Sequence, residues 1–272
     1  MSEEKKKVLV CTPSHDGKLN VGYSMGAFDL IRQKNDLFYY DFFFSEYSSD
    51  IMKARNQMLW YFYHQTEHDF LLFIDSDEGF TAQAVYDLLR ETADYEISAI
   101  PVPLKQLHPD KIIEWVAMEF QDDERQALDV KQMLPSTYEY NHSGDKSDMK
   151  DDRYIYVDKV GTGFMCIPRN VIELMIEHFD TSSDIEFEAP LYTDKMSGNR
   201  CYSFFSHVLH NDKILGEDFS FCMRAREVGI PLKVDTYLKA DHYGTFRWEG
   251  NTMSKKLAQK TRKKIIKKFT EK

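Results

Sequence analysis

An apolar run that ends in two carboxylates constrains the fold of this chain more than any other stretch. Leu71 to Ile74 form a short continuous apolar segment, which is typical of a strand buried on both faces of a parallel sheet. Asp75 and Asp77 follow it directly. Because a strand repeats every two residues, both carboxylates can point the same way at its carboxyl end. Open α/β sheets bind ligands at that edge, so we expect an α/β fold with a site here.

Strand and helix patterns alternate over the first hundred residues, which predicts a mostly parallel central sheet flanked by helices. The expected strands are 7–12, 38–44, 70–74 and 97–102, and the expected helices are 20–34, 50–63 and 81–90. Thr81 is the expected N-cap of the last of these helices. Later in the chain we expect strands at 154–160 and 232–235 and helices at 168–179 and 218–228.

The whole chain reads as a single domain over residues 1–253 followed by a basic helix. Residues 119–153 are polar and acidic, and they predict a flexible excursion or flap. Residues 180–199 predict a long loop. Residues 254–272 predict a lysine-rich amphipathic helix, which either docks on the acidic body of the protein or lies on an anionic membrane surface.

Composition excludes several classes of protein. The formal net charge of −10 argues against general nucleic-acid binding, which needs a cationic surface. The four cysteines form no C-x-x-C pair, so neither a zinc site nor a disulfide framework is indicated and a reducing compartment fits best. No apolar run approaches the length of a bilayer span. We therefore expect a cytoplasmic protein, soluble or peripherally attached to a membrane.

Three further clusters accompany the Asp pair. Gly216-Glu217-Asp218 precedes a predicted helix, Asp241-His242-Tyr243-Gly244 lies near the end of the domain, and Gly161-Thr162-Gly163 follows a predicted strand. Each has an ordinary structural interpretation: helix capping by the acids, a structural histidine, and a strand bulge at the glycines. Paired carboxylates also suit a hard divalent cation that is completed by substrate phosphates.

The order of these motifs from Val8 to Gly250 resembles the GT-A-fold nucleotide-sugar glycosyltransferases. The chain resembles the inverting family 2-like enzymes in particular, including small bacterial and viral members with a P-x-P-x-K segment after the D-x-D. Here that segment is Pro101 to Lys105. The Q-x-x-R-W motif of processive members is missing from the sequence, which argues against a polysaccharide synthase.

The resemblance implies roles for individual residues. A cation, Mn²⁺ or Mg²⁺, would be held by Asp75, Asp77 and His242, and Asp218 would be the general base with Glu217 beside it. Arg247 would be a weaker phosphate contact. The residues expected to bind the nucleotide or the rest of the donor are Thr12, Pro13, Ser14, His15, Arg55, Asn56, Ser76, Lys105, Gly161, Thr162 and Gly163. For Arg55 a solvated helix face is an equal alternative.

The implied activity is transfer of a sugar from a UDP- or GDP-sugar to a hydroxyl of a glycan, lipid-linked or protein acceptor, with inversion. Retaining GT-A enzymes carry similar motifs, so inversion stays a hypothesis. A sugar nucleotidyltransferase is a second enzymatic alternative, although residues 13–18 hold only one glycine and one lysine where that class has a Gly-rich basic loop. The non-enzymatic alternative is a scaffold that binds nucleotide sugars.

Overall fold

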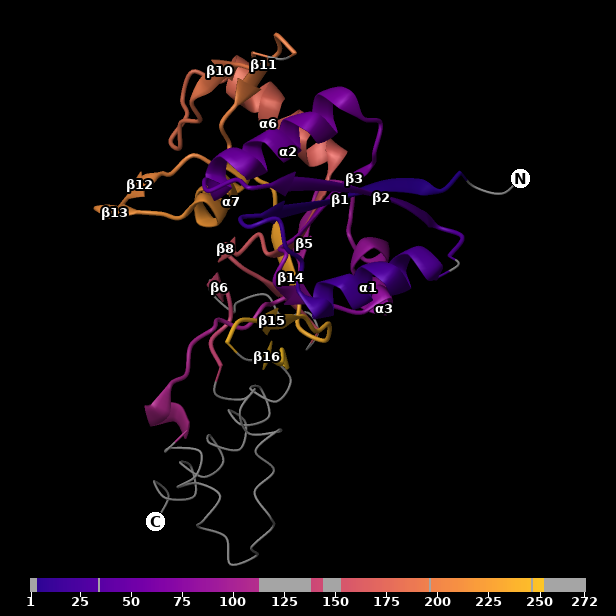
Figure 1. The fold of residues 1–272 in the computed structure, drawn as a ribbon. Helices are drawn as coiled ribbons and strands as arrows, with labels where there is room; N and C mark the ends of the chain where they lie inside the picture. Colours follow the sequence, from indigo (N-terminus) through magenta and orange to yellow (C-terminus); the bar gives the residue numbers. More distant parts are fainter. Residues whose placement is uncertain are drawn as a thin grey trace, which may run out of the picture.

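A seven-stranded sheet forms the centre of the molecule (Figure 1). The structure is a computed structural model that describes residues 4–33, 35–112, 138–143, 153–195, 197–245 and 247–251. The strands lie in the order β2 (Phe38–Glu46), β1 (Lys6–Ser14), β3 (Phe70–Ile74), β9 (Phe164–Pro168), β5 (Ile97–Ala99), β14 (Leu232–Asp235) and β7 (Tyr154–Tyr156). Only β9 and β7 run against the other five strands. The expected mostly parallel α/β sheet is confirmed.

Helices cover both faces of this sheet (Figure 1). One face carries α2 (Ile51–Gln65), α6 (Arg169–Thr181) and α7 (Glu217–Glu227), and the other carries α1 (Val21–Arg32) and α3 (Ala82–Arg90). In β3, Leu71 and Phe73 join the core under the first group, whereas Leu72 and Ile74 join the core under the second. Both faces of β3 are therefore buried, which explains its continuous apolar sequence.

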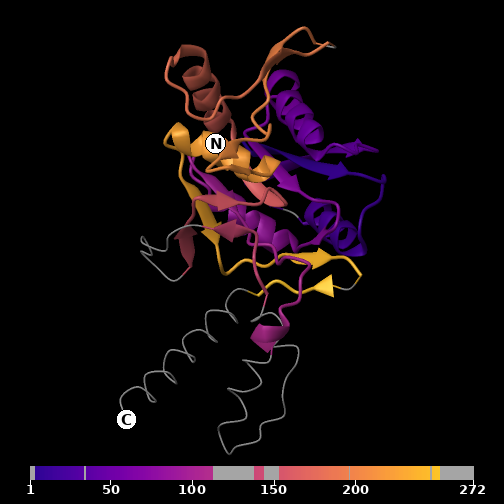
Figure 2. The same cartoon turned by 90° about the vertical axis from the view of Figure 1, so that its left-hand side faces the viewer.

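In the part of the chain that the structure describes, four small strand groups surround the main sheet. They are β10 (Leu191–Thr193) with β11 (Arg200–Tyr202), β12 (Leu209–His210) with β13 (Lys213–Ile214), β6 (His142–Ser143) with β8 (Lys159–Val160), and β4 (Glu78–Gly79) with β15 (Asp241–Tyr243) and β16 (Arg247–Trp248). Figures 1 and 2 place β10 and β11 at the opposite end of the body from β15 and β16. The pairing of β4 with β15 is the one that matters for the site, because it joins the D-x-D segment to the H-x-G segment.

Most expected elements are present, with changed ends. The bounds of β3 agree with the prediction, and the Thr81 side chain caps α3 by accepting a hydrogen bond from the Ala84 N–H at 3.2 Å. Four predictions are corrected. The first strand continues through Ser14, the strand expected at 97–102 ends at Ala99, the strand expected at 154–160 is divided into β7 and β8, and the loop at 180–199 contains β10.

Two expectations concern residues that are mostly or wholly outside the described part of the chain. The acidic excursion at 119–153 is described only for residues 138–143 and 153, and the basic tail at 254–272 is not described at all. The flap and the amphipathic tail therefore stay predictions. Within the described ranges, the structure contains no helix that is both long enough and apolar enough to cross a membrane.

A buried arginine on α7 holds together the long segment before that helix. Arg224 is 1% exposed. Its guanidinium donates to the backbone carbonyls of Phe187 and Phe204 at 3.0 and 2.8 Å, and also to those of Glu188 and Ser206. Burial lowers the pKa of Arg224 to about 10. The arginine of the G-E-D-F-x-F-C-x-R motif is therefore a structural residue that ties α7, which carries Glu217 and Asp218 in its first turn, to the segment before it.

We predict that Arg224→Met destabilises the protein by about 3 kcal/mol, because it leaves several buried carbonyl groups without a donor. The matched control is Arg226→Met, since Arg226 is exposed and pairs with Asp158 at the surface. That change should cost less than about 1 kcal/mol. Urea unfolding measures both, and equal midpoints for the two variants would contradict the role given to Arg224.

Candidate functional site

A cleft of about 520 Å³ opens beside the carboxyl end of β3. Its walls come from the loop after β1, the start of α1, the D-x-D segment and β15. His15, Ser76 and Asp77, three of the residues expected to bind the donor or a cation, line it together with Tyr243. The ligand edge of the sheet predicted from the sequence thus contains a cleft.

Backbone hydrogen bonds fix the D-x-D segment from several sides. The Asp75 N–H donates to the Gly163 carbonyl at 2.9 Å, which ties the segment to the start of β9. The carbonyl of Ser76 accepts from Asn20 at 2.8 Å, and the carbonyl of Asp77 accepts from Tyr243 at 2.7 Å. Because each bond reaches a different part of the chain, the backbone that carries the two carboxylates is held in place.

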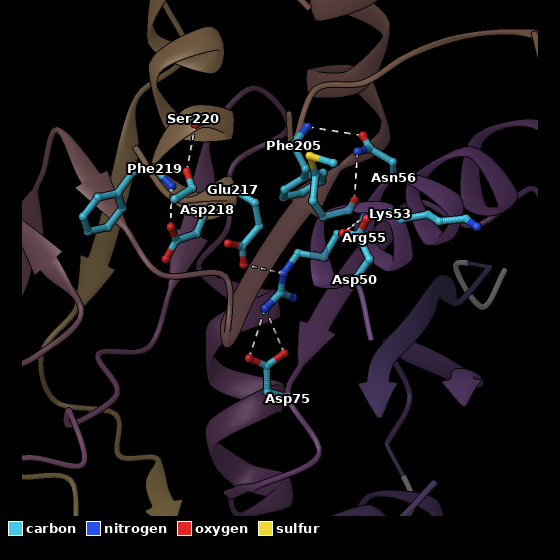
Figure 3. Close-up of polar contacts among 12 residues, drawn as sticks. Asp50, Lys53, Arg55, Asn56, Asp75, Phe205, Glu217, Asp218, Phe219 and Ser220 are labelled. Carbon is cyan, nitrogen blue, oxygen red and sulfur yellow. Dashed lines mark hydrogen bonds and ion pairs between the residues drawn. The ribbon is translucent and has the colours of Figure 1, made fainter. Parts of the chain in front are cut away.

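Arg55 is the centre of the charged network in Figure 3. It lies on the inner face of α2, one and two turns before Leu59 and Phe62, and is 3% exposed. Nη2 contacts both carboxylate oxygens of Asp75 at 3.0 Å, and Nε donates to Glu217 Oε1 at 3.4 Å. The solvated-face interpretation of Arg55 is therefore wrong. The arginine joins the D-x-D motif to the G-E-D motif, which are far apart in the sequence.

The two aspartates of the D-x-D differ in their partners and in their pKa values. Burial raises the pKa of Asp75, and the Arg55 guanidinium opposes that rise. Burial alone would also raise the pKa of Asp77, but His242 and the Lys105 ammonium beside the carboxylate outweigh it and lower the pKa to about 2. Asp77 is thus an anion at any ordinary pH, as a cation ligand must be.

His242 faces Asp77 in an orientation that suits a metal ligand. In the β4–β15 ladder His242 lies opposite Glu78. Nδ1 lies 2.8 Å from the Pro103 carbonyl, so it carries the proton and donates. This leaves Nε2 directed at Asp77 Oδ1, 3.6 Å away. A carbonyl that fixes the tautomer while the other nitrogen faces a carboxylate is a common metal-ligand arrangement.

The residues present fit a divalent cation that shares its coordination with a ligand. Among the described residues no group of three or more His, Cys, Asp and Glu side chains is arranged to hold a metal ion. Asp77 and His242 are the two expected ligands that face each other, and Asp75 is engaged by Arg55. Mg²⁺ and Mn²⁺ sites often have only one or two protein ligands and complete their coordination with phosphate oxygens.

Asp218 stands beside this network without a cationic partner of its own in the described structure (Figure 3). It lies in the first turn of α7, and its Oδ1 accepts the Phe219 N–H at 2.7 Å. Burial, and then the charge of Glu217, raise the pKa of Asp218 to about 6. Glu217 pairs with Arg55, so the two adjacent acids do different things. Asp218 has the elevated proton affinity that a general base needs.

The sequence analysis missed one acidic residue of the site. Glu78 is 2% exposed, and within the described chain its Oε2 has no hydrogen-bond partner. Burial, and then the charges of Asp75 and Asp77, raise the pKa of Glu78 well above its ordinary value. The sequence does show a third acidic residue directly after the D-x-D. Its pairing with His242 across β4 and β15 is visible only in the structure.

The glycines at 161 and 163 make room for protein side chains. A Cβ on Gly163 would lie 2.1 Å from Glu78 Oε1, and one on Gly161 would lie 2.4 Å from the Asn141 side-chain nitrogen. Thr162 between them is 1% exposed. Both glycines were expected to bind the donor, but the space beside them is filled by the side chains of Asn141 and Glu78.

Several residues expected to bind the donor have other partners. The Thr12 hydroxyl shares a 2.6 Å hydrogen bond with Tyr23, and Ser14 Oγ donates to the Lys18 carbonyl at 3.0 Å. Pro13 is buried within β1. The side-chain amide of Asn56 bonds Met52, Ser203 and Phe205, which anchors α2 to the segment before α7. Arg247 pairs with Asp241 at 2.8 Å on β15.

We predict that Arg55→Met destabilises the protein by about 3 kcal/mol near neutral pH, because it leaves Asp75 and Glu217 as partly buried anions without their cationic partner. The loss should shrink as the pH falls, because burial raises the pKa of Asp75 and protonation removes its uncompensated charge. The matched control is Lys53→Met, which removes an exposed cation from the same helix. Urea unfolding at several pH values measures the difference, and a loss independent of pH would contradict the pairing.

Comparison with known proteins gives only a distant likeness. No protein-family model matches the chain, and no curated protein matches it. Among solved structures the chain is similar to the crystal structure of A197 from STIV, at 16% sequence identity and a TM-score of 0.47. The match covers 90% of this chain and 94% of that one. Function is therefore inferred from the site itself.

Proposed function

We propose that this protein is a metal-dependent glycosyltransferase of the GT-A type, which moves a sugar from a UDP- or GDP-sugar to an acceptor hydroxyl with inversion. The meeting of three sequence motifs at one place in the fold carries the proposal. Arg55 connects the D-x-D to the acids at the start of α7, and β4–β15 pairing brings His242 to the same D-x-D. Motifs separated by more than a hundred residues thus meet at the carboxyl end of β3, where Asp77 lines the cleft.

Unsatisfied polar atoms support a ligand at this place. Within the described residues, Arg55 Nη1 and Glu78 Oε2 are buried beside the carboxylates without a hydrogen-bond partner. Buried polar groups in native proteins are nearly always paired, and exceptions need a reason such as a bound ligand, ion or water. The protein alone does not complete the hydrogen bonding of this site, which is expected where a polar substrate binds.

Different residues of the site act on the leaving group and on the nucleophile. Asp77 and His242 would hold a divalent cation, which would supply positive charge for the diphosphate leaving group. Asp218 accepts the proton of the acceptor hydroxyl as that oxygen attacks the anomeric carbon of the sugar. The nucleotide would occupy the cleft lined by His15 and Ser76, while Arg55 keeps Asp75 and Glu217 oriented.

Acceptors of this reaction are a glycan, a lipid-linked sugar or a protein hydroxyl. Inversion follows if Asp218 acts on the hydroxyl from the face opposite the leaving group. The anomeric configuration of the product, read by NMR, tests this part separately. A product with retained configuration would leave the donor site in place and remove Asp218 from the role of base.

Nucleotide binding tests the proposal. Thermal unfolding with UDP, GDP and their sugars, with and without Mn²⁺, should show stabilisation by one base only when metal is present. A ligand at about a hundredfold excess over its Kd adds roughly 2.7 kcal/mol. Asp77→Ala should lose this stabilisation. No shift with any nucleotide in the presence of Mn²⁺ would contradict the proposal.

The role of Asp218 gives a second prediction. Asp218→Asn should lower turnover at least about a hundredfold, because the amide cannot take the proton. The wild-type rate should rise with pH through about 6 and then level off, since the base works only when ionised. The unfolding midpoint of the variant should not fall, because the raised pKa means that the fold tolerates the charged form less well than the neutral one. A variant that keeps its turnover would exclude Asp218 as the base.

A further inference from the structure

We propose that Lys105 competes with the divalent cation for Asp77: it holds this carboxylate in the metal-free protein, leaves when the cation binds, and then contacts the donor's diphosphate. This inference rests on the proposed function. Its starting observation is that both carboxylates of the D-x-D already have a cationic partner from the chain itself. Arg55 pairs with Asp75, and the Lys105 ammonium pairs with Asp77 Oδ2.

Of these two cationic side chains, Arg55 cannot easily separate from its carboxylate, Asp75. Arg55 is 3% exposed, bonds both oxygens of Asp75, and also pairs with Glu217. Its guanidinium carbon lies 5.3 Å from the centre of the Phe73 ring. Removing the arginine from this place would leave a buried charge unpaired. Asp75 is therefore committed to Arg55, and an incoming cation has to bind through Asp77.

Lys105 is placed so that it can move. Its side chain is 32% exposed, and it follows β5 in a segment that belongs to none of the described helices or strands. The lysine stem runs over Gly244, where a Cβ would meet Lys105 Cδ at 3.0 Å. The glycine of the H-x-G segment thus leaves the space that the stem uses. A flexible stem with a single ammonium is suited to exchange one anionic partner for another.

Charge gives the direction of this exchange. A divalent ion between Asp77 and His242 would stand next to the ammonium, and like charges at that distance repel. The diphosphate that arrives with the cation brings new anionic oxygens to the same place, and an ammonium is a good partner for phosphate. Lys105 therefore weakens binding of the bare cation and strengthens binding of the nucleotide.

The experiment is a Mn²⁺ titration of the metal-free protein without nucleotide, followed by calorimetry. Lys105→Met should bind Mn²⁺ roughly three- to tenfold more tightly than the wild type, the range expected for loss of a partly exposed ion pair. Lys105→Arg keeps the charge and should remain close to wild type. The matched control is Lys18→Met, because Lys18 lines the same cleft but pairs with Asp16. A general charge effect would move both methionine variants equally and would overturn the inference.

Nucleotide binding in saturating Mn²⁺ should change in the opposite direction. Lys105→Met should bind UDP or GDP, whichever binds the wild type, roughly three- to tenfold more weakly, because the ammonium no longer contacts the diphosphate. A misfolded site would weaken the binding of both ligands. Tighter binding of Mn²⁺ together with weaker binding of nucleotide in one variant therefore cannot be attributed to misfolding. Unchanged nucleotide affinity would overturn the second half of the inference.

Failure of this inference differs from failure of the proposed function. If Asp77→Asn abolishes Mn²⁺ binding while Lys105→Met leaves its Kd unchanged, Lys105 does not compete and the glycosyltransferase proposal still stands. If neither the wild type nor Lys105→Met binds Mn²⁺, the inference is overturned together with the metal site. If Mn²⁺ behaves as expected but no nucleotide binds, Lys105 does control the cation, and the proposed function fails.

Discussion

A buried guanidinium between two carboxylates is the interaction on which the rest of the site depends. Arg55 reaches Asp75 at the end of β3 and Glu217 at the start of α7, so one side chain ties three elements of the fold to the same point. Burying charge is costly unless it is paired, and breaking such a pair costs more than forming it gains. Arg55 therefore holds the two carboxylates in place mainly because separating them from it would leave a buried charge unpaired. The net free energy gained by forming the ion pairs is the smaller contribution.

The order and type of the central elements followed from hydrophobic periodicity. The β3 strand was predictable to the residue because both of its faces are buried and its end is marked by charged residues. The ends of strands were less predictable where pairing with another strand decides how far they extend. β1 continues through Pro13 because β2 pairs with it as far as Glu46, and residues 191–193 form a strand only because β11 lies opposite. Such pairings involve partners that a local pattern does not contain.

The site was predictable in its motifs and less so in its contacts. Asp77 and His242 face each other as the resemblance implies, and Asp218 has the environment of a base. No local pattern could indicate that Arg55 pairs with acids, because the partners come from β3 and α7. Thr12 was predicted as a ligand contact, but its hydroxyl is taken by Tyr23 on the neighbouring helix. Polar side chains near a site often serve the fold first, and only the three-dimensional neighbours reveal which ones do.

The most direct measurement of the central claim is release of nucleoside diphosphate from nucleotide sugars incubated with the protein and Mn²⁺, with water as the acceptor. The account predicts slow release of UDP or GDP from one donor class by the wild type, with none from Asp77→Ala under the same conditions. Release at equal rates by both proteins, or no release from any donor, would contradict glycosyl transfer at a site built on Asp77 and His242.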